Sequence, residues 1–430
     1  MTAADRWHKS RPQPGEPTCG EHRGKVPTAA HGKGLRWEVR WRDENGKQHK
    51  QGFAKEADAE SRAAVIKTQL DAGTYTDPAA GKVKLRVRGE LYVQGLTVDE
   101  STREAIESRL RLHVYPDLGD REMRILGRSP SILQAWMRSL HAKLAPSYIR
   151  VIRIHLSSIF DAAVDDGIIV RNPLRAASVR APRLPRRKVE PWPEEQVTAV
   201  IAALPPRFRA MGELAAGCGE RQGELFATGV DDVDWLATRK MLRVRRQVKI
   251  VRGHLVFAPP KGDRFREIPM AEPVALALSA HLARFPAVRV TLPWKVPGGK
   301  PVTVPLIFTS AAGKAVVRHD FNKGAWKPAL EAAGVIEPRP EGATTWGPDR
   351  ENGMHALRHF YASALLADGV DIRAVAEYLG HSDPGFTLRV YVHLMPSAEA
   401  RAAAAIERIY ERRAAAADGS CALDVPGGQG

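Results

Sequence analysis

Apolar and polar residues alternate near the start of the chain, in LRWEVRWRDENGKQHKQGF. Its first half has an apolar residue at every second position: Leu35, Trp37, Val39 and Trp41. This alternation is typical of a strand with one buried face, and Asn45-Gly46 is a favoured hairpin turn before the return towards Phe53. From 55 to 72 the apolar spacing becomes helical, and Gly73 supplies a stop. We therefore expect a small sheet-and-helix module over residues 34–78.

The segments on either side of this module have different patterns. Residues 1–33 are rich in Pro, Gly, Lys and His without an apolar period, which predicts a flexible basic tail. Helical spacing dominates residues 84–178, which indicates a helical domain. Its helices are expected around Tyr92 and over 101–115, 131–142 and 147–166.

A second globular part is expected over residues 192–411, after an extended, proline-containing linker at 179–191. A helix begins in PEEQVTAVIAAL, and MLRVRRQVKIVRGHLVFAPPKGDRFREIPM indicates short strands that turn near Gly253 and Gly262. Two Pro/Gly-rich segments, at 292–305 and 338–353, are expected to be inserted loops. The predicted fold class is multidomain and mainly α, with small antiparallel sheets (α+β).

Composition narrows the class of partner. The 430 residues include 65 Lys and Arg against 49 Asp and Glu, a formal net charge of +16, which favours nucleic acid over a membrane surface. No stretch approaches the roughly 18 apolar residues of a membrane span, and the N-terminus lacks the apolar core of a signal peptide, so we expect a cytoplasmic, nucleoid-associated protein. Cys19, Cys218 and Cys421 are far apart and in no CxxC pattern, so they indicate neither a disulfide framework nor a cysteine zinc site.

Two groups of basic residues are candidates for DNA contact. The exposed face of the first predicted strand carries Arg36, Arg40 and Arg42, and its pattern fits DNA contact and a merely solvated strand face equally well. The linker has many basic residues and one acid, Glu190, which favours phosphate contact over simple solubility. Its central basic residues are Arg183, Arg186, Arg187 and Lys188.

The stretch MHALRHF holds two histidines and an arginine on one face of a predicted helix. His355 and His359 are one turn apart, a spacing that suits two zinc ligands. However, the metalloprotease pattern needs glutamate where Ala356 stands, and no third ligand is nearby in the sequence. Arg358 and His355, three residues apart, can instead point at one phosphate.

Five stretches of the second globular part carry unusual polar residues in a fixed order. They are CGERQGELFA with Arg221 and Glu224, PPKGDRFREIPM with Lys261 and Arg266, MHALRHF, EYLGHSDPGFT with His381, and TLRVYVHLMP with Tyr391. This order resembles the tyrosine recombinase, or phage integrase, family, whose signature is arginine, lysine on a β-hairpin, HxxR, a histidine in an LGH context and then tyrosine. The resemblance covers about residues 35–410. Glu220 departs from it, because the family usually has a small or apolar residue before the first arginine.

Transfer of a DNA phosphodiester to an enzyme needs a nucleophile, a proton for the leaving oxygen and positive charge at the non-bridging oxygens. Arg221 and Arg358 are expected to hold those oxygens, because a guanidinium is a fork of donors that stays charged. Tyr391, whose ordinary pKa is near ~10, is the expected nucleophile. The resemblance implies that Lys261 protonates the departing 5′ oxygen.

The remaining polar residues have expected roles around this reaction. His355 is the candidate base or phosphate ligand, and His381 is expected to donate a hydrogen bond to phosphate. Supporting roles are expected for Glu224, Arg266 and His359. No metal or cofactor is required.

The resemblance also implies an integrase of three parts: an arm-type DNA-binding module, a core-binding domain and a catalytic domain, the last two clamping duplex DNA as a C shape. Its partners would be double-stranded attachment sites, a homotetramer of this chain and an accessory directionality protein. The alternatives are a type IB topoisomerase, a DNA-binding relative without the chemistry and, more distantly, a zinc hydrolase at His355 and His359. A helix over 397–417 docks on a neighbouring protomer or on its own domain, and residues 412–430 form a tail.

Overall fold

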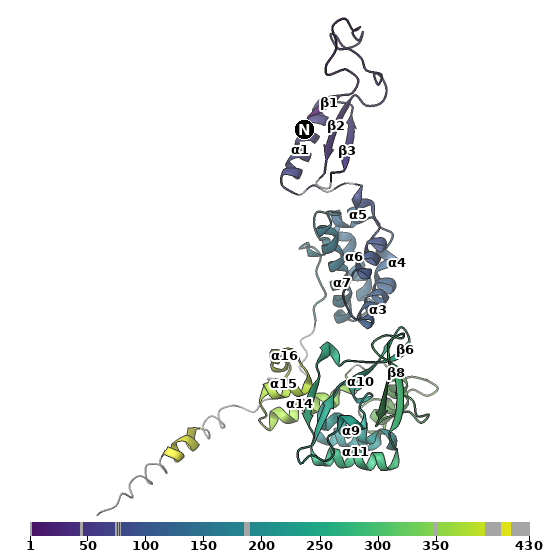
Figure 1. Ribbon diagram of the computed structural model, residues 1–430, viewed down its shortest axis with the longest axis vertical. Helices are drawn as coiled ribbons and strands as arrows, with labels where there is room; N and C mark the ends of the chain where they lie inside the picture. The colour runs from purple at the N-terminus through teal and green to yellow at the C-terminus, as the bar shows by residue number, and fades with distance from the viewer. Residues whose placement is uncertain are drawn as a thin grey trace, which may run out of the picture. The chain divides into compact units, whose positions relative to one another are not determined.

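The computed structural model consists of two compact units, Met1–Pro185 and Arg186–Gly430 (Figure 1). It describes residues 2–43, 46–73, 75, 77, 79–184, 190–347, 349, 351–391 and 406–413. The fold is mainly helical with small antiparallel sheets, as predicted. Within these described ranges, no helix has both the length and the apolar character needed to cross a membrane.

The first unit begins with a three-stranded antiparallel sheet in the order β1-β2-β3. Its elements are β1 (Ala3–Asp5), β2 (Trp37–Arg42), β3 (Gln48–Phe53) and one helix, α1 (Glu56–Asp71). The predicted hairpin pairs Trp37 with Phe53. Alternate residues of β2 are buried together with one face of α1, whereas Arg40 and Arg42 are exposed. The buried side chains are Trp37, Val39, Trp41, Ala59, Ala63 and Ile66.

Residues 2–33, which the sequence analysis expected as a flexible tail, instead join this module. β1 pairs with β2. Beyond β1, the backbone amide of Lys9 donates to the carbonyl oxygen of Val26, and that of Thr28 donates to that of Trp7, so the segment folds back on itself. Its buried side chains are His8, Cys19 and Val26. The sequence shows no apolar period here because the segment has no apolar face, and its backbone is instead closed by hydrogen bonds between distant positions.

A helical bundle follows in the same unit. Its helices are α2 (Leu85–Gln94), α3 (Glu100–Arg109), α4 (Tyr115–Leu118), α5 (Met123–Arg128), α6 (Pro130–His141) and α7 (Pro146–Asp165). A π-helical stretch, Leu110–Val114, joins α3 to α4, and single 3-10 turns lie at Ala80–Lys82 and Pro173–Arg175. Apolar faces meet around Leu110, Leu156 and Phe160. The predicted helices are therefore confirmed to within a few residues.

The second unit has one hydrophobic core, surrounded mainly by helices. They are α8 (Glu194–Ala203), α9 (Pro206–Cys218), α10 (Gln222–Leu225), α11 (Glu272–Arg284), α12 (Arg318–Phe321), α13 (Lys327–Ala332), α14 (His355–Ala367), α15 (Ile372–Leu379) and α16 (Pro384–Tyr391). Shorter turns lie at Val230–Asp232 and Lys261–Asp263, and a π-helical stretch at Asn322–Trp326. α14 packs on α9 and α15, and α15 packs on α16, so the end of α9 faces the C-terminal helices (Figure 1).

Three two-stranded antiparallel sheets complete this unit. They pair β4 (Met241–Val244) with β7 (Arg266–Pro269), β5 (Gln247–Val251) with β6 (His254–Ala258), and β8 (Val288–Pro293) with β9 (Pro301–Leu306). The first two confirm the predicted strands. The third was not predicted, since residues 292–305 were expected to be a loop. Pro293 and Pro301 face each other at the strand ends, where a missing amide is tolerated, while Val290 and Val304 pair and are buried.

Candidate active site

Arg221 stands just after α9, where the chain turns into α10. Gly219 ends α9 at φ +64°, which favours glycine, and a Cβ there would lie 2.3 Å from Cδ1 of Tyr361. Nη1 of Arg221 donates to Oε1 of Glu224 at 3.0 Å, and its backbone amide donates to Oε2 at 2.9 Å. Nη2 donates to the carbonyl oxygen of Gly380 at 3.3 Å. Because the Glu224 carboxylate is buried, this is a positioned pair and not a surface ion pair.

Glu224 also connects this turn to the neighbouring sheet. Arg266, on β7, donates from Nη2 to Oε2 of Glu224 at 2.6 Å and from Nη1 to Oε1 at 3.2 Å. Its Nε donates to the carbonyl oxygen of Tyr378 at 2.6 Å. Burial by itself would raise the pKa of Glu224, but the bonds from Arg266 and the charge of Arg221 outweigh it and lower that pKa. Glu224 is thus an ionised anchor for two guanidinium groups, which suits the supporting roles expected for it and Arg266.

Arg358, on α14, is almost wholly buried, with 1% of its surface exposed. Nη1 donates to the carbonyl oxygen of Gly219 at 2.7 Å, and Nη2 donates to that of Leu379 and lies 3.0 Å from Nε2 of His381. Burial, and then the charge of Arg221, lower the pKa of Arg358 to about 9, so the group remains positive at neutral pH. The ends of α9 and α15 therefore meet at this guanidinium.

His381 follows Gly380, which ends α15 at φ +65°. Its Nδ1 lies 2.7 Å from Oγ1 of Thr387, a buried residue of α16. Because the Arg358 guanidinium can only donate, Nε2 accepts, and Nδ1 carries the proton that is donated to Thr387. Burial, and then the charge of Arg358, lower the pKa of His381 to about 4, in agreement with a neutral ring. The sequence analysis missed Thr387, which no motif marks.

Tyr391 ends α16 with 2% of its surface exposed, and its hydroxyl lies 2.6 Å from Nδ1 of His359. Burial, and then Arg358, lower the pKa of His359, so its ring is neutral, and in the tautomer with the proton on Nε2 its Nδ1 accepts the hydrogen bond from the hydroxyl. Burial raises the pKa of Tyr391 to about 12, an effect that the charge of Arg358 opposes. The tyrosine singled out by the sequence thus has a proton acceptor in contact, and that acceptor is His359, which had been given only a supporting role.

His355 and Lys261 lie at the margin of this network. The ring of His355 is edge-on to that of His359, with centroids 4.7 Å apart, and part of it is exposed. Desolvation, and then the charges of His359 and Arg358, lower the pKa of His355. Lys261 stands on the exposed turn between β6 and β7, outside the hydrogen bonds that connect the other residues. In the described part of the chain, no third His, Cys, Asp or Glu joins His355 and His359 in a metal-binding cluster.

Glu220, which departs from the family pattern, is buried beside Glu224 with 4% of its surface exposed. Burial, and then the negative charge of Glu224, raise the pKa of Glu220 to about 8, so the group is mostly protonated at neutral pH. Glu224 therefore carries one negative charge near three guanidinium groups: Arg221 and Arg266 pair with it, and Arg358 lies within range of its charge. The excess positive charge suits an anion such as phosphate.

The residues expected to contact DNA differ from one another in the structure. Arg40 and Arg42 on β2 are exposed, as is Arg183 after the bundle, and Arg40 also pairs with Glu38 on the same strand. Arg36 is instead engaged in the fold, because its Nε and Nη2 donate to Oδ2 of Asp5 at 3.2 and 2.9 Å. The other three lie outside the described residues: Arg186, Arg187 and Lys188.

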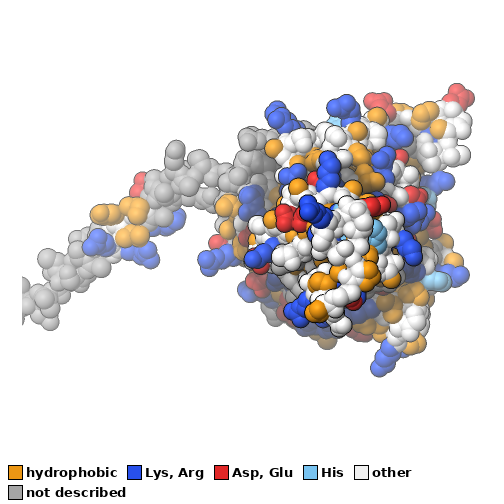
Figure 2. All heavy atoms as spheres, turned by 90° about the horizontal axis from the view of Figure 1, so that it is seen from above, with side chains coloured by type: hydrophobic (Ala, Val, Ile, Leu, Met, Phe, Trp, Pro, Cys, Tyr) orange, Lys and Arg blue, Asp and Glu red, His pale blue; other side chains and the backbone are white. Residues whose placement is uncertain are grey.

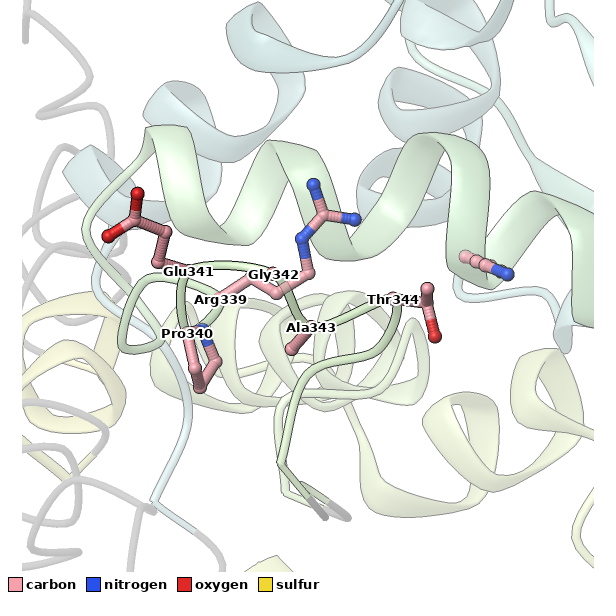
Figure 3. Close-up of a pocket in the computed structure, with 7 residues that line it drawn as sticks. Arg339, Pro340, Glu341, Gly342, Ala343 and Thr344 are labelled. Carbon is pink, nitrogen blue, oxygen red and sulfur yellow. The ribbon is translucent and has the colours of Figure 1, made fainter.

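A surface hollow elsewhere in the second unit is lined by Lys323 and by residues 339–344 of the loop before α14 (Figure 3). This loop is braced by Trp346, whose Nε1 donates to Oε2 of Glu331 at 2.7 Å and whose ring lies 4.9 Å from the Arg339 guanidinium. None of the six predicted catalytic residues lines the hollow. It is therefore a separate feature of the loop.

Comparison with known proteins connects this geometry to a family. The phage integrase family matches residues 192–397. The tyrosine recombinase XerC-like protein of Caldanaerobacter subterraneus subsp. tengcongensis is 27% identical over 281 residues, which cover 61% of this chain and 66% of that protein. Tyrosine recombinase XerC of Mycobacterium tuberculosis is 28% identical over 323 residues, covering 72% of this chain and 93% of the relative. The chain thus spans slightly less than two thirds of the first relative and most of the second.

Solved structures share the fold at low identity. The Tn1549 transposon integrase in complex with a circular intermediate DNA has a TM-score of 0.60 and 19% identity, over 76% of this chain and 99% of the compared chain. A lambda integrase dimer bound to a COC′ core site has a TM-score of 0.51 and 16% identity, over 82% and 91%. Residues 192–397 thus belong to the phage integrase, or tyrosine recombinase, family, whose members break and rejoin DNA.

Proposed function

We propose that this chain is a site-specific tyrosine recombinase, an integrase that cuts and rejoins DNA through a 3′-phosphotyrosyl intermediate and so integrates or excises a mobile element. One observation carries the proposal: the Tyr391 hydroxyl contacts the neutral ring of His359 at 2.6 Å, close to the positive charge of Arg358. Formation of a phosphotyrosyl bond requires a phenol with a proton acceptor and positive charge beside the phosphate.

In the proposed first step, the Tyr391 hydroxyl gives its proton to Nδ1 of His359 while its oxygen forms a bond to phosphorus. The bond from phosphorus to the 5′ oxygen breaks, and Lys261 supplies the proton that this oxygen takes. Arg221 and Arg358 hold the two non-bridging oxygens. One phosphate ester replaces another, so a second 5′ hydroxyl can reverse the step on a new strand without an external energy source.

Phosphate binding requires Arg358 and His381 to change partners. Arg358 donates to the carbonyl oxygens of Gly219 and Leu379, and Nε2 of His381 accepts from Arg358. To donate to phosphate, His381 needs a proton on Nε2, by protonation or by a change of tautomer. The negative charge of phosphate favours protonation, because it raises the pKa of a neighbouring imidazole. We infer that the site described above is a resting arrangement, with its donors satisfied internally until DNA arrives.

Double-stranded attachment sites are the proposed substrate. The net charge of +16, with Lys and Arg side chains spread across the face in Figure 2, favours such a polyanion. In this proposal the sheet-and-helix module is the arm-type domain, with Arg40 and Arg42 as phosphate contacts, and the bundle of α2 to α7 is the core-binding domain. The linker after the bundle adds Arg183 as a further contact.

A homotetramer on DNA is proposed by analogy, since a lambda integrase tetramer has been solved bound to a Holliday junction. Residues 406–413 are helical and expose apolar side chains, which suits docking on a neighbouring protomer better than burial in the same domain. These side chains are Ile406, Ile409 and Tyr410. The directionality of the reaction is assigned to an accessory protein.

A suicide substrate tests the proposed chemistry. Nicked duplex with candidate attachment DNA traps the covalent intermediate, because the short strand released at the nick diffuses away. We expect a denaturation-resistant protein–DNA adduct from the wild-type chain and none from Tyr391→Phe, which should bind DNA almost normally because one hydroxyl is a small part of a phosphate-dominated interface. Tyr378→Phe is the matched control, since Tyr378 contacts the site through its backbone oxygen.

Other outcomes select the alternatives. Tight binding without adduct on any attachment DNA would favour a non-catalytic DNA-binding relative. Plasmid relaxation by a monomer, without strand exchange, would favour a type IB topoisomerase. An adduct that forms in EDTA excludes a zinc hydrolase at His355 and His359, and an adduct that persists in Tyr391→Phe would overturn the assignment of the nucleophile.

A further inference from the structure

Four side chains that commonly bind metal ions meet in the N-terminal segment, which belongs to the first unit, whereas the recombinase site belongs to the second. They are His8, Cys19, His22 and His31, and their ligand atoms all lie within 4.8 Å of one another. Sγ of Cys19 is 3.4 Å from Nδ1 of His22 and 3.0 Å from Nε2 of His31. A tetrahedral zinc ion with bonds of ~2.0–2.3 Å separates its ligands by roughly 3.3–3.8 Å. The cluster therefore already has almost the size of a zinc site.

His8 supplies an independent observation. Its side chain is buried, with 4% of the residue exposed, and its Nε2 has no hydrogen-bond partner. Nδ1 of the same ring lies 2.8 Å from Oδ2 of Asp5. The carboxylate holds the proton on Nδ1 and leaves the lone pair of Nε2 directed away from it, which is the carboxylate–histidine arrangement found behind metal ligands. A bound cation would satisfy the buried nitrogen that nothing else satisfies.

Asp5 is itself held in place by two cations of the module. Arg36 donates to its Oδ2 through Nε and Nη2, and Nζ of Lys25 donates to the same oxygen at 3.2 Å. Asp5 is the last residue of β1, so the carboxylate that holds the His8 ring in place is itself fixed by the sheet. This explains why Arg36 is drawn away from the exposed face where the sequence analysis had placed it.

The segment also lacks another source of stability. Among residues 2–34, Cys19 and Val26 are the only buried apolar side chains. A chain of this length cannot hold a defined path with so small a core, and natural folds of this size use disulfides or metals instead. Its ordered backbone is nevertheless closed by hydrogen bonds around the cluster, including Cys19 N to Lys25 O at 2.8 Å and Thr28 N to Trp7 O at 2.8 Å.

We propose that His8, Cys19, His22 and His31 bind one structural Zn²⁺ that fastens residues 7–33 to the sheet of the N-terminal module. Cysteine thiolate and histidine imidazole are the ligand types that zinc binds in proteins, and four protein ligands leave no open position for catalysis. No CxxC pattern marks this site in the sequence, because a Cys-x-x-His pair is completed here by two histidines that are distant along the chain. The site does not depend on the proposed recombinase activity and takes no part in strand transfer.

Metal content tests this proposal directly. The full chain, purified without a histidine tag and then dialysed, should contain about one zinc per chain by elemental analysis. Cys19→Ser and the double variant His22→Ala/His31→Ala should lose more than half of that zinc. Two matched controls should retain it: Cys218→Ser, which removes a buried thiol of the second unit, and His141→Ala, which removes an exposed imidazole.

A second measurement needs no variant. Co²⁺ added to chelator-treated protein should produce the visible bands of tetrahedral cobalt and a thiolate-to-cobalt band, saturating at about one equivalent. Trypsin should cut after Arg23 and Lys25 faster in the metal-free protein than in the zinc-loaded one. Wild-type protein without zinc and without cobalt bands would overturn the proposal, and so would zinc content that none of the ligand variants reduces.

Discussion

The hydroxyl of Tyr391 is hydrogen-bonded to Nδ1 of His359 at 2.6 Å, and this single contact joins the last residue of α16 to the helix that carries the HxxR motif. Two influences act on the pKa of the phenol. Burial raises it, and the positive charge of Arg358 opposes that rise. Since the pKa of the phenol is raised to about 12, a base in contact is needed for attack at neutral pH.

Removal of that base should slow covalent joining. We expect His359→Ala to reduce the single-turnover rate of adduct formation by about 10²–10⁴-fold, the usual contribution of a positioned base, with DNA affinity almost unchanged. The residual rate should increase with pH up to the pKa of Tyr391, because hydroxide must then remove the proton. His355→Ala is the comparison variant. If it reduces the rate of adduct formation more than His359→Ala does, His355 is the base.

The buried ion pair between Glu224 and Arg266 should contribute more to the free energy of unfolding than a partly exposed ion pair of Arg243, which lies on the strand next to Arg266. Arg266→Met leaves the Glu224 carboxylate without its main partner in a buried place, and we expect it to reduce the free energy of unfolding by about 3–5 kcal/mol. Arg243→Met removes a partly exposed cation that pairs with Glu267 at 3.1 Å across β4 and β7 and with Asp234 at 3.0 Å, and it should reduce the free energy of unfolding much less. Urea unfolding measures both, and equal losses would contradict the buried role.

Ionisation of the buried Glu220 should make the folded chain less stable as the pH rises. Its pKa of about 8 in the folded chain lies above the ordinary value of 4.5, so its contribution is complete below pH 4.5 and is lost as pH rises through about 8. Glu220→Gln cannot ionise, and its melting temperature relative to wild type should therefore increase between pH 5 and pH 8.5. Glu341→Gln, at an exposed position, should show no such trend. A constant difference for Glu220→Gln would mean that Glu220 is ionised throughout.

Some arginines of the N-terminal module should contribute to DNA binding, and another should contribute to the stability of the module. Arg40→Ala and Arg42→Ala should each weaken binding to arm-type DNA and reduce the slope of log affinity against log salt by about one, as expected for a lost phosphate contact. Arg36→Ala should instead loosen the module, because Asp5 loses its bidentate partner. Fluorescence anisotropy at several salt concentrations, together with thermal unfolding, distinguishes the two effects. A salt slope unchanged by all three would remove this face from the DNA contacts.

Local pattern was enough to predict much of this molecule. A period of two selected Trp37, Val39 and Trp41 for burial, and helical spacing predicted the bundle and α14, because both depend on residues within a few positions of one another. The order of Arg221, Lys261, HxxR, LGH and Tyr391 was sufficient to identify the family resemblance. Proline at the ends of β8 and β9 concealed a hairpin, since the residue that forbids a central strand is tolerated at an edge.

By itself, then, the sequence determined which chemical groups the chain carries and which short segments form helices and strands. Only the tertiary structure decided which of these groups touch, because the decisive contacts join distant positions: Arg358 with Gly219, Glu224 with Arg266, Tyr391 with His359. Long-range packing also buries Glu220, which makes its ionised form unfavourable. It likewise brings Cys19 into contact with His31 in a segment without an apolar pattern. Burial and proximity set the charge and reactivity of a side chain, and neither is encoded in any single window of the sequence.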